Sequence, residues 1–177
     1  MEKVLFSAAD IRRMLARLAH EIVEKNTDIS TVALVGVLRR GVPLAKSIAV
    51  EIEAITGTEV PVGMLDITLY RDDLREIGDS ARLRGSAIDF SIVGKKIIIV
   101  DDVIFTGRTV RAAIDAIFDI NRPKCIQLLT LVDRGHRELP IKPDFVGKNI
   151  PTSLSEKIMV EVPEYDGESA IKLCSLK

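Results

Sequence analysis

The chain of 177 residues lacks several features that define whole classes of proteins. It has no tryptophan and only two cysteines, Cys125 and Cys174, which stand far apart and lack the spacing of metal ligands. A disulfide framework and a cysteine-based metal site are therefore not indicated. We expect both thiols to be reduced, as they are in the cytoplasm, and we predict a cytoplasmic protein.

The sequence also lacks a long apolar segment and an excess of charge of either sign. No run approaches the roughly 20 apolar residues of a membrane span, and the N-terminal residues show no signal peptide, so no membrane partner is expected. The 25 basic and 26 acidic residues give a net charge of −1. Binding to a nucleic acid would consequently need a local basic patch.

What is present is a chain with 47% hydrophobic residues, in which short apolar strands alternate with amphipathic helices. Ser7 and Asp10 predict the start of the first helix, and Pro43 and Gly57 predict the ends of the second. Each predicted helix has one apolar face. The predicted strands are residues 32–37, 60–70, 96–102, 125–133 and 157–162. The predicted helical faces are Ile11, Met14, Leu15, Leu18 and Ile22; Leu44, Ile48, Ile52 and Ile55; and Val110, Ala113, Ile114, Ile117 and Phe118.

This alternation predicts an α/β fold with a doubly wound, mostly parallel central sheet flanked by helices, in a single domain over residues 1–177. In such sheets, ligands bind beyond the carboxyl ends of the strands. Polar clusters at 39–41, 101–109 and 133–137 follow predicted strands, so we expect them to form the rim of an active site. The charged segment 71–90 has few large apolar residues, and we predict that it is a small mobile lid.

The stretch KIIIVDDVIFTGRTV, residues 96–110, brings two aspartates and a glycine turn to one place. The turn Thr106, Gly107, Arg108 and Thr109 predicts a phosphate site, because backbone N–H groups converge at a helix start. Asp101 and Asp102 would repel a phosphate, but carboxylates accept hydrogen bonds from vicinal hydroxyls and hold Mg²⁺ directly or through water. Together these residues predict a site for ribose 5-phosphate.

This stretch resembles the signature of the type I phosphoribosyltransferases, which bind 5-phosphoribosyl 1-pyrophosphate. DITLYRDDL, LVDRGHRELPI and DFVGKNIPTSLSEK resemble the bacterial pyrimidine-operon attenuation regulators of that family, which are also uracil phosphoribosyltransferases. The resemblance covers essentially the whole chain and implies the type I fold with a small hood, in a homodimer or higher homo-oligomer. It implies two activities: synthesis of UMP from uracil and 5-phosphoribosyl 1-pyrophosphate with Mg²⁺ as cofactor, and UMP-dependent binding to a hairpin in the leader mRNA of the pyrimidine operon.

The resemblance also implies roles for particular residues. Arg39, Arg40 and Gly41 correspond to the loop that binds pyrophosphate, where a peptide bond is often cis without a proline. Arg71 belongs to the lid that closes over pyrophosphate and excludes water. The residues expected to be catalytic are Asp101, Asp102, Arg40 and Arg71, with Asp101 and Asp102 also expected at the metal.

Uracil is expected to be recognised largely by backbone groups, at Val132, Asp133, Arg134 and Val146. Phe105 stands where purine-specific relatives carry an aspartate that accepts a proton from the base. This difference argues against a purine substrate and against a dedicated general base.

A local basic patch is predicted on the outer face of the first helix and in two later loops. Its cations and hydrogen-bonding side chains suit phosphate, 2′-hydroxyl and base-edge contacts. The residues expected to bind RNA are Arg17, His20, Lys25, His136, Arg137, Lys148, Asn149, Thr152 and Ser153. Many family members have a threonine in place of Ala16 and a Lys-Thr pair in place of Leu38-Arg39, and both differences lie outside the Asp-Asp and Thr-Gly-Arg-Thr core.

Three alternatives remain at this stage. The chain could be a uracil salvage enzyme without RNA regulation, or a module that senses UMP and 5-phosphoribosyl 1-pyrophosphate without turnover. The acidic pair and the arginine loop argue against the second of these. An ordinary nucleotide-binding α/β domain is disfavoured, because the sequence has neither Gly-x-x-x-x-Gly-Lys nor Gly-x-Gly-x-x-Gly.

Overall fold

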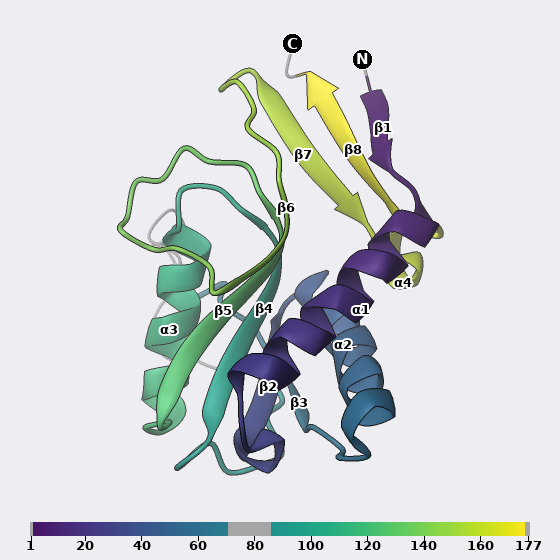
Figure 1. Ribbon diagram of the computed structural model, residues 1–177. Helices are drawn as coiled ribbons and strands as arrows, with labels where there is room; N and C mark the ends of the chain where they lie inside the picture. The colour runs from purple at the N-terminus through teal and green to yellow at the C-terminus, as the bar shows by residue number, and fades with distance from the viewer. Residues whose placement is uncertain (1, 71–85, 176–177) are drawn as a thin grey trace.

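The computed structural model describes residues 2–70 and 86–175, which form two sheets with flanking helices (Figure 1). The larger sheet is parallel throughout, with spatial order β3 (Val62–Leu65), β2 (Val32–Val37), β4 (Lys96–Ile104), β5 (Cys125–Asp133), β6 (Phe145–Asn149). Its helices are α1 (Ala8–Lys25), α2 (Gly41–Thr56) and α3 (Arg108–Ile120), and a 3-10 turn covers Ile29–Thr31. None of the described helices is both long and apolar enough to cross a membrane.

The parallel sheet is covered on both faces, as the apolar strands predict. Successive side chains of β2 and β4 point to opposite sides. Leu34 and Ile98 join the cluster that contains α1 and α2, whereas Val35 and Ile99 join the cluster that contains α3. Figure 1 shows α1 and α2 on one side of the sheet and α3 on the other. The predicted doubly wound fold is therefore confirmed.

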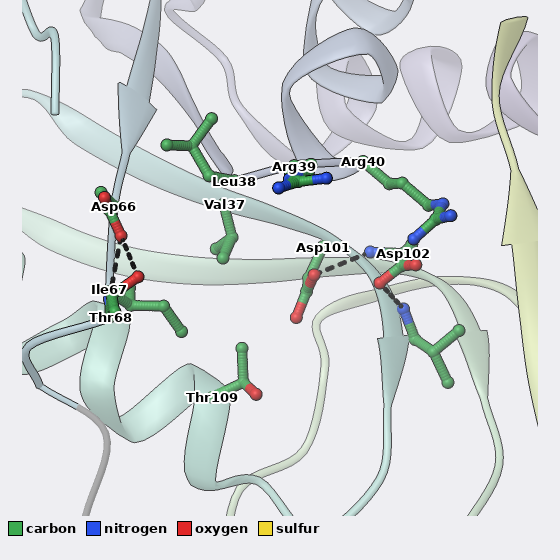
Figure 2. Close-up of a pocket in the computed structure, with 11 residues that line it drawn as sticks. Val37, Leu38, Arg39, Arg40, Asp66, Ile67, Thr68, Asp101, Asp102 and Thr109 are labelled. Carbon is green, nitrogen blue, oxygen red and sulfur yellow. Dashed lines mark hydrogen bonds between the residues drawn. The ribbon is translucent and has the colours of Figure 1, made fainter. Parts of the chain in front are cut away.

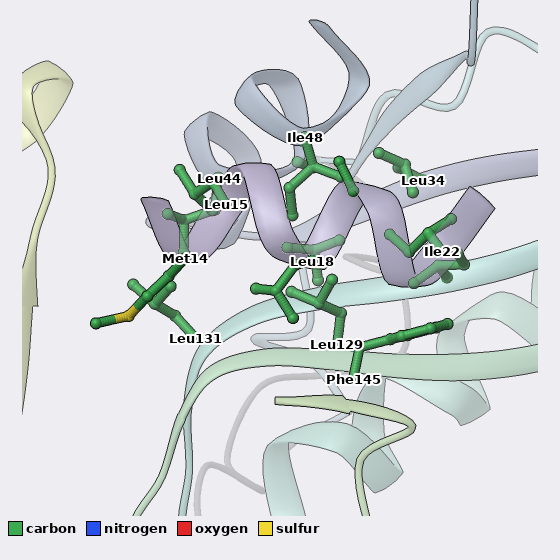
Figure 3. Packing of buried hydrophobic residues seen from close by; sticks show 14 of the residues in the cluster. Met14, Leu15, Leu18, Ile22, Leu34, Leu44, Ile48, Leu129, Leu131 and Phe145 are labelled. Atoms are coloured by element: carbon green, nitrogen blue, oxygen red, sulfur yellow. The ribbon is translucent and has the colours of Figure 1, made fainter. Parts of the chain in front are cut away.

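Helix α1 has the predicted cap and the predicted apolar face. The Ser7 N–H donates to the Asp10 carboxylate at 2.9 Å, and the Asp10 N–H donates back to Ser7 Oγ, so the two residues form a capping box. Figure 3 shows the apolar face of the helix over the sheet. Leu18 and Ile22 are fully buried there, against Leu129 of β5.

The second sheet is antiparallel, with the order β1 (Glu2–Phe6), β8 (Ala170–Ser175), β7 (Glu156–Glu161), and a short helix α4 (Pro163–Asp166) precedes β8. We call these four elements the hood. Both ends of the described chain lie in it (Figure 1). Its inner residues Ile158, Val160 and Ile171 belong to the same apolar cluster as α1 and α2, so the hood packs on the main domain as part of one core.

Several details differ from the sequence predictions. Strands β1, β6 and β8 were not predicted, because they are short and their burial does not follow a simple alternation. Strand β4 continues two residues beyond Asp102, and α2 begins two residues before Pro43. Ile55 and Phe118 were expected on buried faces but are exposed, because each lies in the last turn of its helix, beyond the last fully buried residues Ile52 and Ile117.

The predicted lid over 71–90 falls mostly outside the described residues, and so does Arg71. The described part begins at Ser86, and Ala87 forms an antiparallel bridge with Met64 of β3. Ile88 and Phe90 pack against the apolar cluster on the α3 side of the sheet. Residues 86–90 therefore extend the edge of the sheet beside β3.

A matched pair of substitutions on α2 tests this packing. Ile48 is fully buried and Val50 is 64% exposed. Ile48→Ala should lower the free energy of unfolding by about 2–5 kcal/mol, because it removes buried methyl groups and leaves a cavity. Val50→Ala should change it by about 0.5 kcal/mol or less. Urea unfolding would measure both values, and equal effects would contradict the assigned faces of the helix.

Candidate functional site

The three predicted polar clusters meet at the carboxyl edge of the parallel sheet. The Arg40 side chain from the end of β2 borders the same cavities as Asp102 of β4. Backbone contacts join the other two clusters, since the Arg134 N–H donates to the Ile104 carbonyl at 3.2 Å. Arg137 reinforces this junction by donating to the Phe105 carbonyl at 2.9 Å. The predicted rim is thus formed by the ends of three adjacent strands.

Asp101 and Asp102 lie within β4, near its end, and Figure 2 shows both beside a cavity. Burial raises the pKa of Asp101 well above its ordinary value, and the neighbouring charge of Asp102 adds to the rise. Burial also raises the pKa of Asp102, but hydrogen bonds and the charge of Arg40 oppose the rise. The N–H groups of Asp102 and Val103 donate to these carboxylates at 2.9 and 2.8 Å. Two carboxylates with so few protein partners are suited to a ligand that supplies hydroxyls or a cation.

The cavity in Figure 2 measures about 460 Å³. Its polar lining includes Arg39, Arg40, both aspartates of β4 and Thr109 of α3. Two cations that follow β2 and the two carboxylates of β4 therefore share one cavity. Asp66, Ile67 and Thr68, which follow β3, also line it, although the sequence analysis did not select them. The rule that ligands bind where parallel strands end would have indicated them, because they follow the predicted extended segment 60–70.

The turn before α3 has the features of the predicted phosphate site. Gly107 caps the helix with a φ of 93°, in the left-handed region that favours glycine. The Thr106 hydroxyl accepts a hydrogen bond from the Arg108 N–H at 3.3 Å. The Arg108 guanidinium pairs with Glu138 at 2.6 Å, whereas Thr109 of the same turn lines the cavity.

Gly41 is required by the close approach of two elements. A Cβ at this position would lie 2.3 Å from the carbonyl oxygen of Val100, the residue that precedes Asp101. The loop of Arg39, Arg40 and Gly41 is therefore packed directly on the strand that carries the two carboxylates. The peptide bond between Leu38 and Arg39 is cis, as the resemblance implied for this loop.

A second cavity of about 370 Å³ lies between the rim and the hood. Arg40, Asp102 and Val103 border both cavities, so the two share a boundary. The rest of its lining comes from Phe105, Arg134 and the β7 residues Lys157, Ile158, Met159 and Val160. The β7 residues were predicted only as a strand of the core, since no motif marks them.

Arg134 and Phe105 form the connection between this second cavity and the hood. The guanidinium of Arg134 stacks over the Phe105 ring at 4.1 Å, and the His136 ring meets the same aromatic ring edge-on at 5.8 Å. Arg134 also donates to Thr152 Oγ1 at 3.0 Å and to the carbonyls of Ser153 and Glu156 at 3.3 and 2.5 Å. One buried arginine therefore links the turn at the phosphate site to the loop that leads into β7.

Of the four residues predicted to bind the base, Arg134 lines the second cavity. Val132 is fully buried in the core. The Asp133 carboxylate accepts from the Gly135 N–H and pairs with Arg137 at 2.5 Å. The Val146 carbonyl accepts from Arg17 at 3.1 Å.

The residues predicted to bind RNA divide into two groups. Arg17, Lys25 and Arg137 already have protein partners: Arg17 pairs with Glu21 and donates to the carbonyls of Val146 and Gly147, and Lys25 pairs with Asp144 at 2.9 Å. The His136 ring contacts the Thr152 carbonyl at 2.6 Å. His20, Lys148, Asn149 and Ser153 are exposed. Lys148 lies 5.8 Å from the Phe6 ring, beside a groove that α1 also lines.

The described residues contain no group of three or more histidine, cysteine, aspartate or glutamate side chains that could hold a metal ion. A cation at Asp101 and Asp102 would therefore take most of its ligands from a substrate and from water. This fits Mg²⁺, which keeps several waters and is usually bound through one or two carboxylates together with substrate phosphates.

The raised pKa of Asp101 predicts a gain in stability when its charge is removed. The folded protein keeps this proton to a higher pH than the unfolded chain does, so the free energy of unfolding falls as pH rises above the ordinary pKa of aspartate. Asp101→Asn keeps the shape and should raise the unfolding free energy at pH 7, by more than it does at pH 5. Urea unfolding at both values would measure this.

Asp89→Asn is the matched control, because Asp89 is an exposed aspartate outside the cavities. It should change stability little at either pH. A loss of stability in Asp101→Asn at pH 7, or a gain that does not depend on pH, would contradict the assigned burial of the charge.

Comparison with known proteins identifies the family of the chain. Residues 5–166 match the family model described as a phosphoribosyl transferase domain. The Bifunctional protein PyrR of Chloroflexus aurantiacus is 59% identical over 166 residues, covering 94% of this chain and 91% of that protein. The protein of the same name from Thermus thermophilus is 57% identical over 169 residues, covering 96% and 93%.

Solved structures show the same fold at low sequence identity. A hypoxanthine-guanine phosphoribosyltransferase of Bacillus anthracis has a TM-score of 0.72 at 21% identity, covering 98% of this chain and 97% of that one. A hypoxanthine phosphoribosyltransferase of Trypanosoma cruzi has a TM-score of 0.72 at 19% identity, covering 99% and 97%. The chain therefore belongs to the phosphoribosyl transferase domain family, and within it to the group of bifunctional PyrR proteins.

Proposed function

We propose that the chain transfers a phosphoribosyl group from 5-phosphoribosyl 1-pyrophosphate to uracil and that, with the product UMP bound, it binds a leader-mRNA hairpin of the pyrimidine operon. The observation that carries the proposal is the acidic pair of buried Asp101 and half-buried Asp102, which lies between a helix-start turn and an arginine loop. The high identity to proteins named as bifunctional supports the assignment of two activities to one chain.

The larger cavity is the site for 5-phosphoribosyl 1-pyrophosphate. The turn from Thr106 to Thr109 takes the 5-phosphate through backbone N–H groups and hydroxyls. The two carboxylates accept hydrogen bonds from the ribose hydroxyls, and Arg39 and Arg40 face the pyrophosphate. Arg71, which the resemblance assigns to pyrophosphate, lies outside the described residues.

Uracil occupies the smaller cavity, between Phe105, Arg134 and β7. The cavity is bounded by an aromatic ring and apolar side chains, which suit a flat base with polar edges. Phe105 offers no proton acceptor to the base. Because Arg40, Asp102 and Val103 border both cavities, the base nitrogen and the anomeric carbon meet at this shared boundary.

In the reaction, N1 of uracil attacks C1 of the ribose, the bond from C1 to the pyrophosphate oxygen breaks, and the N1 proton is released. The protein lowers the barrier by holding the two reactants in line and by placing arginine cations where negative charge develops. Mg²⁺, held through Asp101 and Asp102 directly or by water, would neutralise the pyrophosphate and ribose oxygens. Burial of the site limits attack by water on C1.

Binding of RNA is assigned to exposed groups on α1 and β6 and in the loop 149–153, where His20, Lys148, Asn149 and Ser153 are accessible. The connection between the two activities is Arg134. It contacts Phe105 beside the nucleotide site and also holds Thr152 and Ser153. A nucleotide that orders Phe105 would thereby order part of the RNA-binding loop.

Asp102→Asn tests the transferase. The variant keeps the shape of the side chain but loses the charge that faces the ribose, so kcat for UMP formation should fall by about a hundredfold or more. Formation of UMP from labelled uracil measures this, with Asp89→Asn as the control. Unchanged turnover in Asp102→Asn would refute the assigned role of the acidic pair.

A titration with RNA tests the regulator and separates it from the alternative, a uracil salvage enzyme without RNA regulation. The pyrimidine-operon leader hairpin should bind the wild type more tightly when UMP is present at fixed salt. Lys148→Ala should weaken binding and lower the slope of log K against log salt by about one, while turnover is unchanged.

Lys46→Ala provides the control for the RNA titration, because Lys46 is an exposed lysine on α2. It should leave both the affinity and the salt slope close to those of the wild type. Weak binding by the wild type that UMP does not change would support the salvage enzyme instead.

A further inference from the structure

Arg40 lies at the point where the two cavities meet. Its guanidinium borders the larger cavity together with Asp101 and Asp102, and it borders the smaller cavity together with Phe105. In the proposed reaction, the bond that forms joins a group in one cavity to a group in the other. A displacement of this one side chain would therefore alter both substrate positions.

The position of Arg40 is fixed by a residue of the hood, which no sequence motif selected. Arg40 Nε donates to Asp166 Oδ2 at 3.1 Å and Arg40 Nη2 donates to Asp166 Oδ1 at 2.7 Å. This is the side-on, bidentate pairing that sets the plane and direction of a guanidinium. The two partners belong to different parts of the fold, since Arg40 follows β2 of the parallel sheet and Asp166 ends α4 of the hood.

The Asp166 carboxylate is itself held in place. Its Oδ2 accepts the Val162 N–H at 2.9 Å, and α4 ends at Gly167 in the left-handed conformation. Hydrogen bonding to Arg40 is the main cause that lowers the pKa of Asp166, so the carboxylate is charged at neutral pH. The pair is only partly exposed, with 35% of the Arg40 side chain and 18% of the Asp166 side chain accessible.

The geometry leaves part of the guanidinium available to a ligand. Of its five N–H groups, the pairing uses the one on Nε and one on Nη2. The remaining N–H groups have no hydrogen-bond partner among the described residues. They can therefore donate to phosphate oxygens in the larger cavity while Asp166 keeps its contact.

Asp102 is the competing partner for Arg40. It borders both cavities beside the guanidinium, and its charge also favours the charged form of Arg40. Without Asp166, the arginine would turn toward Asp102 and neutralise the carboxylate that faces the ribose. Asp166 thus keeps the Arg40 guanidinium apart from the Asp102 carboxylate where the two cavities meet.

We propose that Asp166 is a positioning residue for phosphoribosyl transfer, which holds the Arg40 guanidinium at the boundary of the two cavities and away from Asp102. The inference rests on the proposed function, because it assigns the larger cavity to 5-phosphoribosyl 1-pyrophosphate. In this proposal the hood positions an arginine of the active site, and it also forms one wall of the smaller cavity.

Kinetics of four variants test this proposal. Asp166→Asn should lower kcat/KM for 5-phosphoribosyl 1-pyrophosphate by about tenfold or more, because misplaced groups lose much of their catalytic effect. Asp166→Glu can remake a bidentate pair and should recover part of the loss. Glu164→Gln, an exposed residue on the same short helix, should behave as the wild type. Arg40→Gln alone should be slower than Asp166→Asn.

A double-mutant cycle separates positioning from a structural role. If Asp166 acts through Arg40, adding Asp166→Asn to Arg40→Gln should lower kcat/KM by less than twofold further. Losses that multiply in the double variant would overturn the proposal. So would an Asp166→Asn variant that melts at a lower temperature but has the kcat/KM of the wild type.

Calorimetric binding of 5-phosphoribosyl 1-pyrophosphate distinguishes failure of this inference from failure of the proposed function. A wild type that binds this ligand but forms no UMP would refute the proposed reaction. The role of Asp166 would then be decided by the double-mutant cycle of Asp166→Asn and Arg40→Gln, with Kd for the ligand measured in place of kcat/KM. A wild type that does not bind the ligand at all would overturn both proposals. Wild-type affinity together with wild-type kcat/KM in Asp166→Asn, with normal turnover in the wild type, would overturn the positioning role alone.

Discussion

The burial of two adjacent carboxylates in the central strand β4 is the constraint on which the rest of the structure depends. Removing charge from water is costly, and here it raises the pKa of both groups instead of being fully offset by protein partners. Two backbone N–H groups and Arg40 supply only part of the compensation. A ligand that brings hydroxyls or a cation would complete it, and in a site of low dielectric constant those contacts are stronger than they would be in water. Such contacts would therefore contribute to the affinity for a ligand with hydroxyls or a cation.

Two arginines connect the hood to this site, and each also has a structural reason to be there. Arg40 follows β2 and pairs with Asp166 of α4. Arg134 follows β5 and donates to the carbonyls of Ser153, which precedes β7, and of Glu156, the first residue of β7. An apolar interface alone would allow the hood to shift by small amounts at little cost, whereas bidentate and multiple hydrogen bonds fix direction as well as distance. The antiparallel sheet is therefore placed accurately relative to the parallel one, which is necessary if a base held by one and a ribose held by the other are to react.

The central part of this arrangement could be predicted from the sequence because its signals are local. The capping box at Ser7, the apolar strands 32–37 and 125–133 and the turn at Gly107 each depend on neighbouring residues, and each was found where expected. The hood could not be predicted in the same way, because β1 and β8 are paired from opposite ends of the chain and have little alternation of their own. The pairs Arg40–Asp166 and Arg134–Ser153 were missed for the same reason: a salt bridge or a carbonyl contact between distant segments leaves no periodic pattern.

The same reasoning changes how the basic residues are interpreted. The sequence presents Arg17, Lys25 and Arg137 as solvent-facing cations, but in the folded chain each has a carboxylate partner, and two of them also donate to backbone carbonyls. These contacts attach α1 to the edge strand β6 and support the rim, while the Arg17 and Lys25 side chains stay exposed. The loop 149–153 is different, because Arg134 attaches it to Phe105 beside the nucleotide site. An effector can change RNA affinity only if it interacts differently with the two conformations of the RNA-binding surface. In the proposed function, this loop is the described segment whose contacts reach from the nucleotide site to that surface, so coupling between UMP and RNA would depend on Arg134 more than on the number of exposed cations.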